Sequence, residues 1–170
     1  MWVPLLLTAL VRVAWLERFP TDPIAPVDAE GFHLLAVNVL AGRGFAIGWE
    51  PPFCATAIRT PLYPLLLMGT YGWLGPNPRA AVLVQVLLEV LTAAGMMRLA
   101  RTVGRDGGKA AARVALVAGM LYALNGTTQR YTGYLLSEAL LLPVQMAALW
   151  ATARLLRRPS PGRAALAGAG

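Results

Sequence analysis

Long apolar stretches alternate with short polar segments along this chain, and four of the stretches approach the length that a bilayer requires. The apolar core of a bilayer is about 30 Å thick, so a spanning helix needs roughly 20 apolar residues. The pattern predicts an all-α polytopic membrane protein with four transmembrane helices, at residues 1–16, 79–101, 111–126 and 134–156. The remaining segments are predicted as a first outer loop (17–78), an inner basic loop (102–110), a second outer loop (127–133), and an inner loop with the start of a truncated next segment (157–170).

A fifth apolar run, residues 62–74, is too short to cross a bilayer as a straight helix. At ~1.5 Å per residue it extends only about 20 Å. Thr60 and Gly75 flank it as typical start and stop signals. We therefore expect a juxtamembrane helix at 60–75 that lies at the membrane surface. Its interfacial anchors are expected to be Tyr63, Tyr71 and Trp73.

Composition and charge support a lipid environment and set the orientation. The chain is 57% hydrophobic and 14% charged, whereas an ordinary soluble domain is about 45–50% apolar and about 25% charged. Its net charge is +7, but the basic residues gather at the ends of apolar runs, so nucleic acid is not an expected partner. Basic residues dominate 98–113 and 154–163, which places these two segments inside and the first loop outside. If 62–74 crossed the bilayer as a further span, the orientation of every segment after it would be inverted.

The first outer loop contains a second expected juxtamembrane helix, at residues 28–41. Apolar residues recur there with helical spacing from Phe32 onward, and Gly42 is a typical stop. The pattern predicts an amphipathic helix along the membrane interface. It places His33, the only histidine, on the polar side, and Asp28 at the N-cap.

Two carboxylates are the candidate catalytic residues. Asp28 lies in the first outer loop, and Glu138 lies just inside the outer end of the fourth predicted span. Acids at membrane depth are costly and usually face an internal cavity, so we expect both to face one outer cavity. One could deprotonate an acceptor hydroxyl or amine, while the other binds a metal, orients the acceptor or stabilises a developing sugar cation. For Asp28 the structural alternative is an N-cap worth about 1 kcal/mol.

Two arginines on the outer side, Arg59 and Arg130, are the candidates for binding a leaving phosphate, because a guanidinium matches phosphate geometry. The alternative for each outer arginine is a contact with lipid headgroups, and we favour that alternative for Arg43 and Arg79. Further accessory candidates are Glu30, His33, Tyr63 and Tyr131. His33 with the nearby acids offers too few ligands to define a metal site, so a divalent metal stays open and unassigned.

The ordered set of segments resembles the N-terminal part of the C-type (GT-C) glycosyltransferase superfamily. The nearest branch holds the bacterial protein mannosyltransferase-like and lipid A aminoarabinose transferase-like enzymes. The matching pieces are an opening span, D-x-x-x-F-x-x-x-A from Asp28 with NVLAGRGF after it, RTPLYPLLL from Arg59, a GPNP turn, a span ending in a basic loop, and YTGYLLSEALLL from Tyr131. These pieces cover nearly the whole chain.

The resemblance implies a multi-pass enzyme of the inner (plasma) membrane that works on the periplasmic or outer face. Its donor would be a polyprenyl-phosphate-linked sugar, and its acceptor a lipid or a protein. Asp28 would be the base or acceptor-binding carboxylate, and Glu138 the acid of the second outer loop. The family commonly has two adjacent acids in the first loop, whereas here Ala29 follows Asp28 and Glu30 comes one position later. Because whole members have more spans, we expect this chain to be a fragment, incomplete as an enzyme alone.

Two other classes of protein stay open on the sequence. A transporter or permease fragment would place polar residues at mid-membrane and contain broken helices. A non-catalytic membrane scaffold would need only the apolar spans.

The predicted topology can be tested at Cys54, the only cysteine, which lies in the first outer loop. A membrane-impermeant thiol reagent added outside intact cells should label it, and the Cys54→Ser variant should give no signal. Labelling only after the cytoplasmic side is opened would invert the topology.

Overall fold

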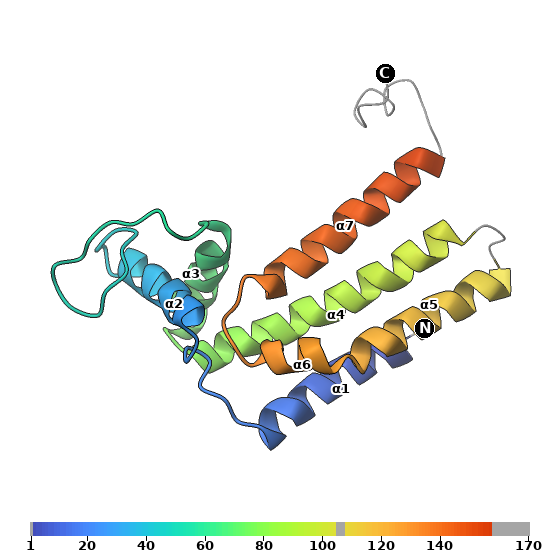
Figure 1. Ribbon diagram of the computed structural model, residues 1–170, viewed down its shortest axis with the longest axis horizontal. Coiled ribbons are helices and arrows are strands. Elements are labelled where there is room, and N and C mark those ends of the chain that lie inside the picture. The colour runs from blue at the N-terminus through green and yellow to red at the C-terminus, as the bar shows by residue number, and fades with distance from the viewer. Residues whose placement is uncertain (1, 105–107, 158–170) are drawn as a thin grey trace. The chain divides into compact units, whose positions relative to one another are not determined.

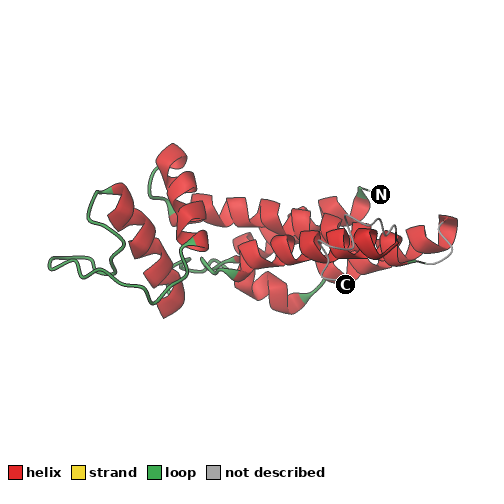
Figure 2. Cartoon of the chain, turned by 90° about the horizontal axis from the view of Figure 1, so that it is seen from above, coloured by secondary structure: helices red, strands yellow, loops and turns green. Residues whose placement is uncertain are grey.

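The computed structural model describes residues 2–104 and 108–157, and this part of the chain is all-α, as predicted (Figure 2). Its β-structure is confined to a single bridge between Ala46 and Ala55. The helices are α1 (Val3–Arg18), α2 (Val27–Leu40), α3 (Leu62–Leu74), α4 (Pro78–Val103), α5 (Gly108–Ala123), α6 (Gly126–Thr132) and α7 (Glu138–Arg157) (Figure 1).

Two to three candidate membrane spans are present in the described residues. Helices α4 and α7 are long and apolar enough to cross a bilayer, and α5 and α6 are a third candidate if the broken pair counts as one span. Helices α4 and α7 overlap the second and fourth predicted spans, and the candidates support a membrane location. Helix α5 overlaps the third predicted span, whereas α6 occupies most of the predicted second outer loop, which is therefore helical. The predicted first span is helix α1, whose 16 residues fall short of the roughly 20 required, so its crossing stays a prediction.

Helix α3 falls within the segment predicted as a juxtamembrane helix and is not among the candidate spans. It ends at Leu74 and is followed by Gly75, whose φ of 74° lies in the left-handed region that favours glycine. Its position along the membrane surface stays a prediction. The middle of the predicted inner basic loop (105–107) and nearly all of the predicted tail (158–170) lie outside the described residues.

The chain divides into two compact units. Unit 1 consists of the described residues of Met1–Val11, Leu88–Asn125 and Leu141–Gly170, and unit 2 consists of Arg12–Leu87 and Gly126–Leu140.

In unit 1, small residues allow the helices to approach closely. A Cβ on Gly119 of α5 would lie 2.8 Å from both Pro4 of α1 and Met97 of α4, and a Cβ on Gly95 of α4 would lie 2.8 Å from Met146 of α7. Helices in a membrane associate through such close packing, because lipid offers no hydrophobic driving force. The buried acid Glu89 accepts a 2.5 Å hydrogen bond from the Tyr122 hydroxyl, which offsets part of the cost of burying it.

In unit 2, α2 packs on α3, and their apolar faces form one core with the start of α4 and the segment before α7. The rings of Phe32 and Tyr63 meet edge to face with centroids 5.0 Å apart. The core consists of Ala29, Phe32, Ala36, Tyr63, Leu67, Tyr71, Ala81, Val82 and Leu135.

Tyr63 and Tyr71 are core residues, so their prediction as interfacial anchors is wrong. They are 1% and 3% exposed, because their rings fill the space between α2 and α3 while their hydroxyls find partners inside the unit. Trp73, on the same helix, is 91% exposed, as an anchor would be.

Gly119 provides a test of the packing in unit 1. Gly119→Leu should lower the free energy of unfolding by about 1–3 kcal/mol, because the new side chain must displace the Pro4 and Met97 contacts. Val117→Leu, at an exposed position of the same helix, should change little. Thermal unfolding of the purified protein in detergent measures both variants, and equal melting temperatures would contradict the close approach.

Candidate functional site

The site begins with an ion pair between the start of α2 and the loop before α3. A terminal nitrogen of Arg59 donates to Oδ1 of Asp28. The guanidinium also lies over the Phe32 ring, 5.6 Å from its centroid. Gly31 lies beside this arginine, and a Cβ at that position would make an ordinary van der Waals contact with Arg59 Nε at 3.5 Å. The structure therefore brings together two of the predicted site residues, a carboxylate and a phosphate-binding candidate.

Asp28 is not the N-cap of α2, contrary to the structural alternative considered for it. The helix begins at Val27, and the capping position belongs to Pro26, which has extended backbone and no side-chain cap. Asp28 thus lies inside the first turn, where its negative charge interacts favourably with the helix dipole. Its carboxylate projects toward Arg59. Its side chain is 58% exposed and that of Arg59 24% exposed, so a ligand in solvent can reach the carboxylate more easily than the guanidinium.

Glu30 is held by the loop that follows α2. Its Oε1 accepts a 2.8 Å hydrogen bond from the Trp49 indole. The Trp49 ring in turn lies 5.9 Å from the His33 ring. Glu30 therefore holds the loop that contains Trp49 against the first turns of α2, which also carry Asp28.

His33 is buried, so its prediction on the polar side of the helix is wrong. Helix α3 and Trp49 cover that side, and His33 Nδ1 lies 3.0 Å from the Tyr71 hydroxyl. Burial lowers the pKa of His33, against smaller opposing effects of Asp22 and Glu30, and burial raises the pKa of Tyr71. Both groups are therefore neutral at pH 7. Among the described residues, no group of three or more His, Cys, Asp or Glu side chains is placed to hold a metal ion.

Asn38 organises the loop that carries Trp49, and the sequence analysis did not identify it. The side chain is 1% exposed, and its Nδ2 donates to the carbonyls of Ala46 at 2.8 Å and Gly48 at 3.0 Å. Its Oδ1 accepts a 3.4 Å hydrogen bond from Arg43. The available signal was an amide inside an apolar helical stretch (AVNVL) directly before a glycine-rich loop.

The hydroxyl of Tyr63 points into the core of unit 2 and donates to Oε1 of Gln85. Burial is the main reason that the pKa of Tyr63 is raised, with smaller effects of Tyr71 and Glu138. This phenol stays protonated and is occupied by its amide partner, so the structure gives it a packing contact rather than an open position beside Asp28.

The remaining predicted residues lie near the second outer loop. Glu138 is the first residue of α7 and is exposed, with Ser137 donating to its Oε2 at 3.4 Å. Arg130 and Tyr131 are exposed on α6 and help to line a cavity of about 630 Å³. The other lining residues are Trp15, Phe19, Thr21, Thr127 and Tyr134. Neither Asp28 nor Glu138 lines this cavity, so a cavity shared by the two acids stays a prediction.

Comparison of the chain with profiles of protein families, with curated protein sequences and with solved structures finds no significant match.

The buried His33 predicts a pH dependence of stability. Its folded-state pKa lies below its ordinary value of 6.5, so the unfolded chain takes up the proton first as the pH falls. The contribution of neutral His33 is complete above pH 6.5 and is lost as the pH falls through the folded-state pKa. His33→Gln cannot titrate and keeps a polar partner for Tyr71.

Melting temperatures of the wild type and the variant between pH 7.5 and 5 provide the measurement. The wild type should lose more stability toward low pH than the variant. Identical slopes for the two proteins would show that burial of His33 has no such effect.

Proposed function

We propose that this chain is part of a membrane glycosyltransferase that moves a sugar from a polyprenyl-phosphate donor to a lipid or protein acceptor on the outer face of the membrane. The observation that carries the proposal is the Asp28–Arg59 ion pair on the surface of unit 2. The same unit contains the first turns of α4, a candidate membrane span, and we infer that the pair lies near the membrane that holds the lipid-linked donor.

In the proposed reaction, Asp28 acts as the general base. Its carboxylate takes the proton of an acceptor hydroxyl or amine as that atom attacks the anomeric carbon. The bond between the anomeric carbon and the phosphate oxygen breaks, and the polyprenyl phosphate leaves with the bonding electrons. The proton on Asp28 then passes to water.

Arg59 has two roles in this scheme. It orients Asp28 through one of its five N–H donors, and we propose that its remaining terminal donors bind the departing phosphate. Arg130, exposed on α6, is the second phosphate-binding candidate, and Glu138 is the proposed second carboxylate for the acceptor or the sugar cation.

Replacement of the base tests the proposal. Asp28→Asn in the full-length protein should reduce sugar transfer by about 100-fold or more, because a positioned general base contributes 10²–10⁴-fold. The assay uses membranes that contain the protein and polyprenyl phosphates carrying radiolabelled mannose, glucose or aminoarabinose. The label that is transferred from the polyprenyl donor to another lipid or to protein is then counted.

Glu50→Gln is the matched control, since Glu50 is an exposed carboxylate of the same outer loop. It should keep wild-type transfer. Full activity of Asp28→Asn at equal membrane abundance would remove the role assigned to Asp28.

A transporter fragment is the second candidate, and one observation favours it. The candidate span made of α5 and α6 is interrupted at Leu124 and Asn125, and discontinuous helices are typical of transporter binding sites. Solute uptake into vesicles that survives Asp28→Asn, together with no sugar transfer by the wild type, would favour this class.

A further inference from the structure

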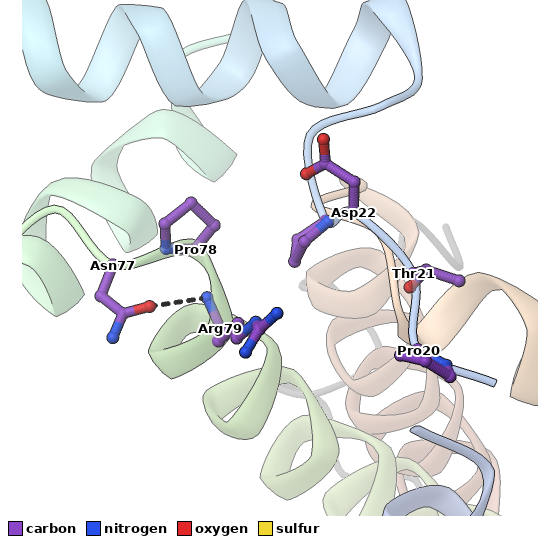
Figure 3. A pocket seen from close by; sticks show the side chains of 7 residues that line it. Pro20, Thr21, Asp22, Asn77, Pro78 and Arg79 are labelled. Carbon is purple, nitrogen blue, oxygen red and sulfur yellow. Dashed lines mark hydrogen bonds between the residues drawn. The ribbon is translucent and has the colours of Figure 1, made fainter. Parts of the chain in front are cut away.

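A groove separate from the Asp28–Arg59 pair lies in unit 2, where the segment after α1 meets the start of α4 (Figure 3). Its outer part has a volume of about 460 Å³ and is lined by Pro20–Pro23 and Asn77–Arg79. A second hollow of about 350 Å³ shares Pro20, Thr21, Pro23 and Arg79 with it, so the two are continuous. We call them together the Arg79 groove.

The outer part of the Arg79 groove presents opposite charges on its two walls. Figure 3 shows Asp22 and Arg79 on opposite sides, with the arginine extending toward Pro20 and Thr21. Among the residues that the structure describes, neither side chain forms an ion pair, and Asp22 Oδ1 accepts only the Ile24 N–H at 3.2 Å. Both charges are therefore available to a ligand.

The backbone at the start of α4 is not the binding feature. Asn77 Oδ1 already accepts from the N–H groups of Arg79 at 3.0 Å and Ala80 at 3.4 Å. The Arg79 guanidinium is the cationic donor group among the residues that line the groove.

The inner part of the Arg79 groove is largely apolar and extends along α1 and α4, away from the loop. Val82 and Leu83 line it from α4, and Val13 and Leu16 line it from α1. Val82 lies three residues beyond Arg79, or about 5 Å further along α4 at ~1.5 Å per residue. Because α4 is a candidate span that starts at Pro78, we expect Arg79 at headgroup level and the apolar hollow toward the acyl chains.

We propose that the Arg79 groove binds one phospholipid with a zwitterionic headgroup, phosphatidylethanolamine. The phosphate binds the Arg79 guanidinium, the ammonium binds the Asp22 carboxylate, and the first part of an acyl chain fills the apolar hollow. Glu17 adds a second carboxylate to the α1 wall, which disfavours an anionic headgroup. The ammonium of phosphatidylethanolamine donates hydrogen bonds to a carboxylate, whereas the quaternary nitrogen of phosphatidylcholine has none to donate.

Native mass spectrometry of the full-length protein in detergent tests this site. The protein is titrated with phosphatidylethanolamine, phosphatidylcholine or phosphatidylglycerol of identical acyl chains, and the dissociation constant of the first bound lipid is measured. Phosphatidylethanolamine should bind about tenfold more tightly than phosphatidylglycerol, a difference of about 1.4 kcal/mol.

Two variants separate the parts of the site without disturbing its local structure. Arg79→Gln keeps the capping of α4 and should weaken phosphatidylethanolamine about tenfold. Asp22→Asn keeps the acceptor for Ile24 N–H and should abolish the preference for phosphatidylethanolamine over phosphatidylglycerol. Arg18→Gln and Glu50→Gln change exposed residues that do not line the groove, and both should bind like the wild type.

Equal binding of the three lipids by the wild type, or wild-type affinity in Arg79→Gln, would show only unspecific lipid around the helices and would overturn the proposal. Displacement of phosphatidylethanolamine by polyprenyl phosphate at equal concentration would also overturn it, by assigning the groove to a lipid-linked phosphate. The measurement does not involve sugar transfer, so the two proposals can fail separately.

Discussion

The side-chain amide of Gln85 is the interaction on which unit 2 depends. It is 1% exposed in an apolar helix, where an unsatisfied amide costs several times the net worth of a hydrogen bond. It accepts from the Tyr63 hydroxyl and donates to the carbonyls of Thr132 at 3.2 Å and Tyr134 at 2.9 Å. Helix α3 and the segment between α6 and α7 are thereby fixed to α4. Tyr63 contacts Phe32, so the same constraint extends to α2 and its ion pair.

A second buried amide, that of Asn38, orders the first outer loop in the same way. Asn38 satisfies its own hydrogen-bonding groups by binding the carbonyls of irregular backbone, so the loop carrying Trp49 is ordered against α2. Trp49 then binds Glu30, while the neighbouring Asp28 keeps an exposed carboxylate next to Arg59. Polar groups buried in the helices thus fix the surface on which the proposed chemistry depends.

The charged groups of unit 2 differ in how far the protein itself satisfies them. Glu30 is engaged by Trp49, and Asp28 shares Arg59 while staying open to solvent. Asp22 and Arg79 line one groove, and neither forms an ion pair with another residue in the described part of the chain. The two proposals follow this difference. The sugar transfer is assigned to the Asp28–Arg59 pair, and the lipid binding is assigned to Asp22 and Arg79.

The sequence by itself determined the all-α class, the positions of the candidate spans and the short helices of the first loop, because apolar length, helical spacing and glycine stops are local properties. It did not determine how many spans there are, since α1 has 16 residues and the third candidate is a broken pair. Tertiary structure decided the fate of single side chains. His33 and Tyr71 are buried against each other, and Asp28 binds an arginine 31 residues away in the sequence. Gln85 binds the backbone carbonyl of Tyr134, 49 residues further along the chain. Periodicity can place a residue on a face of a helix, but only the segments packed against that face decide whether it meets water, lipid or a partner.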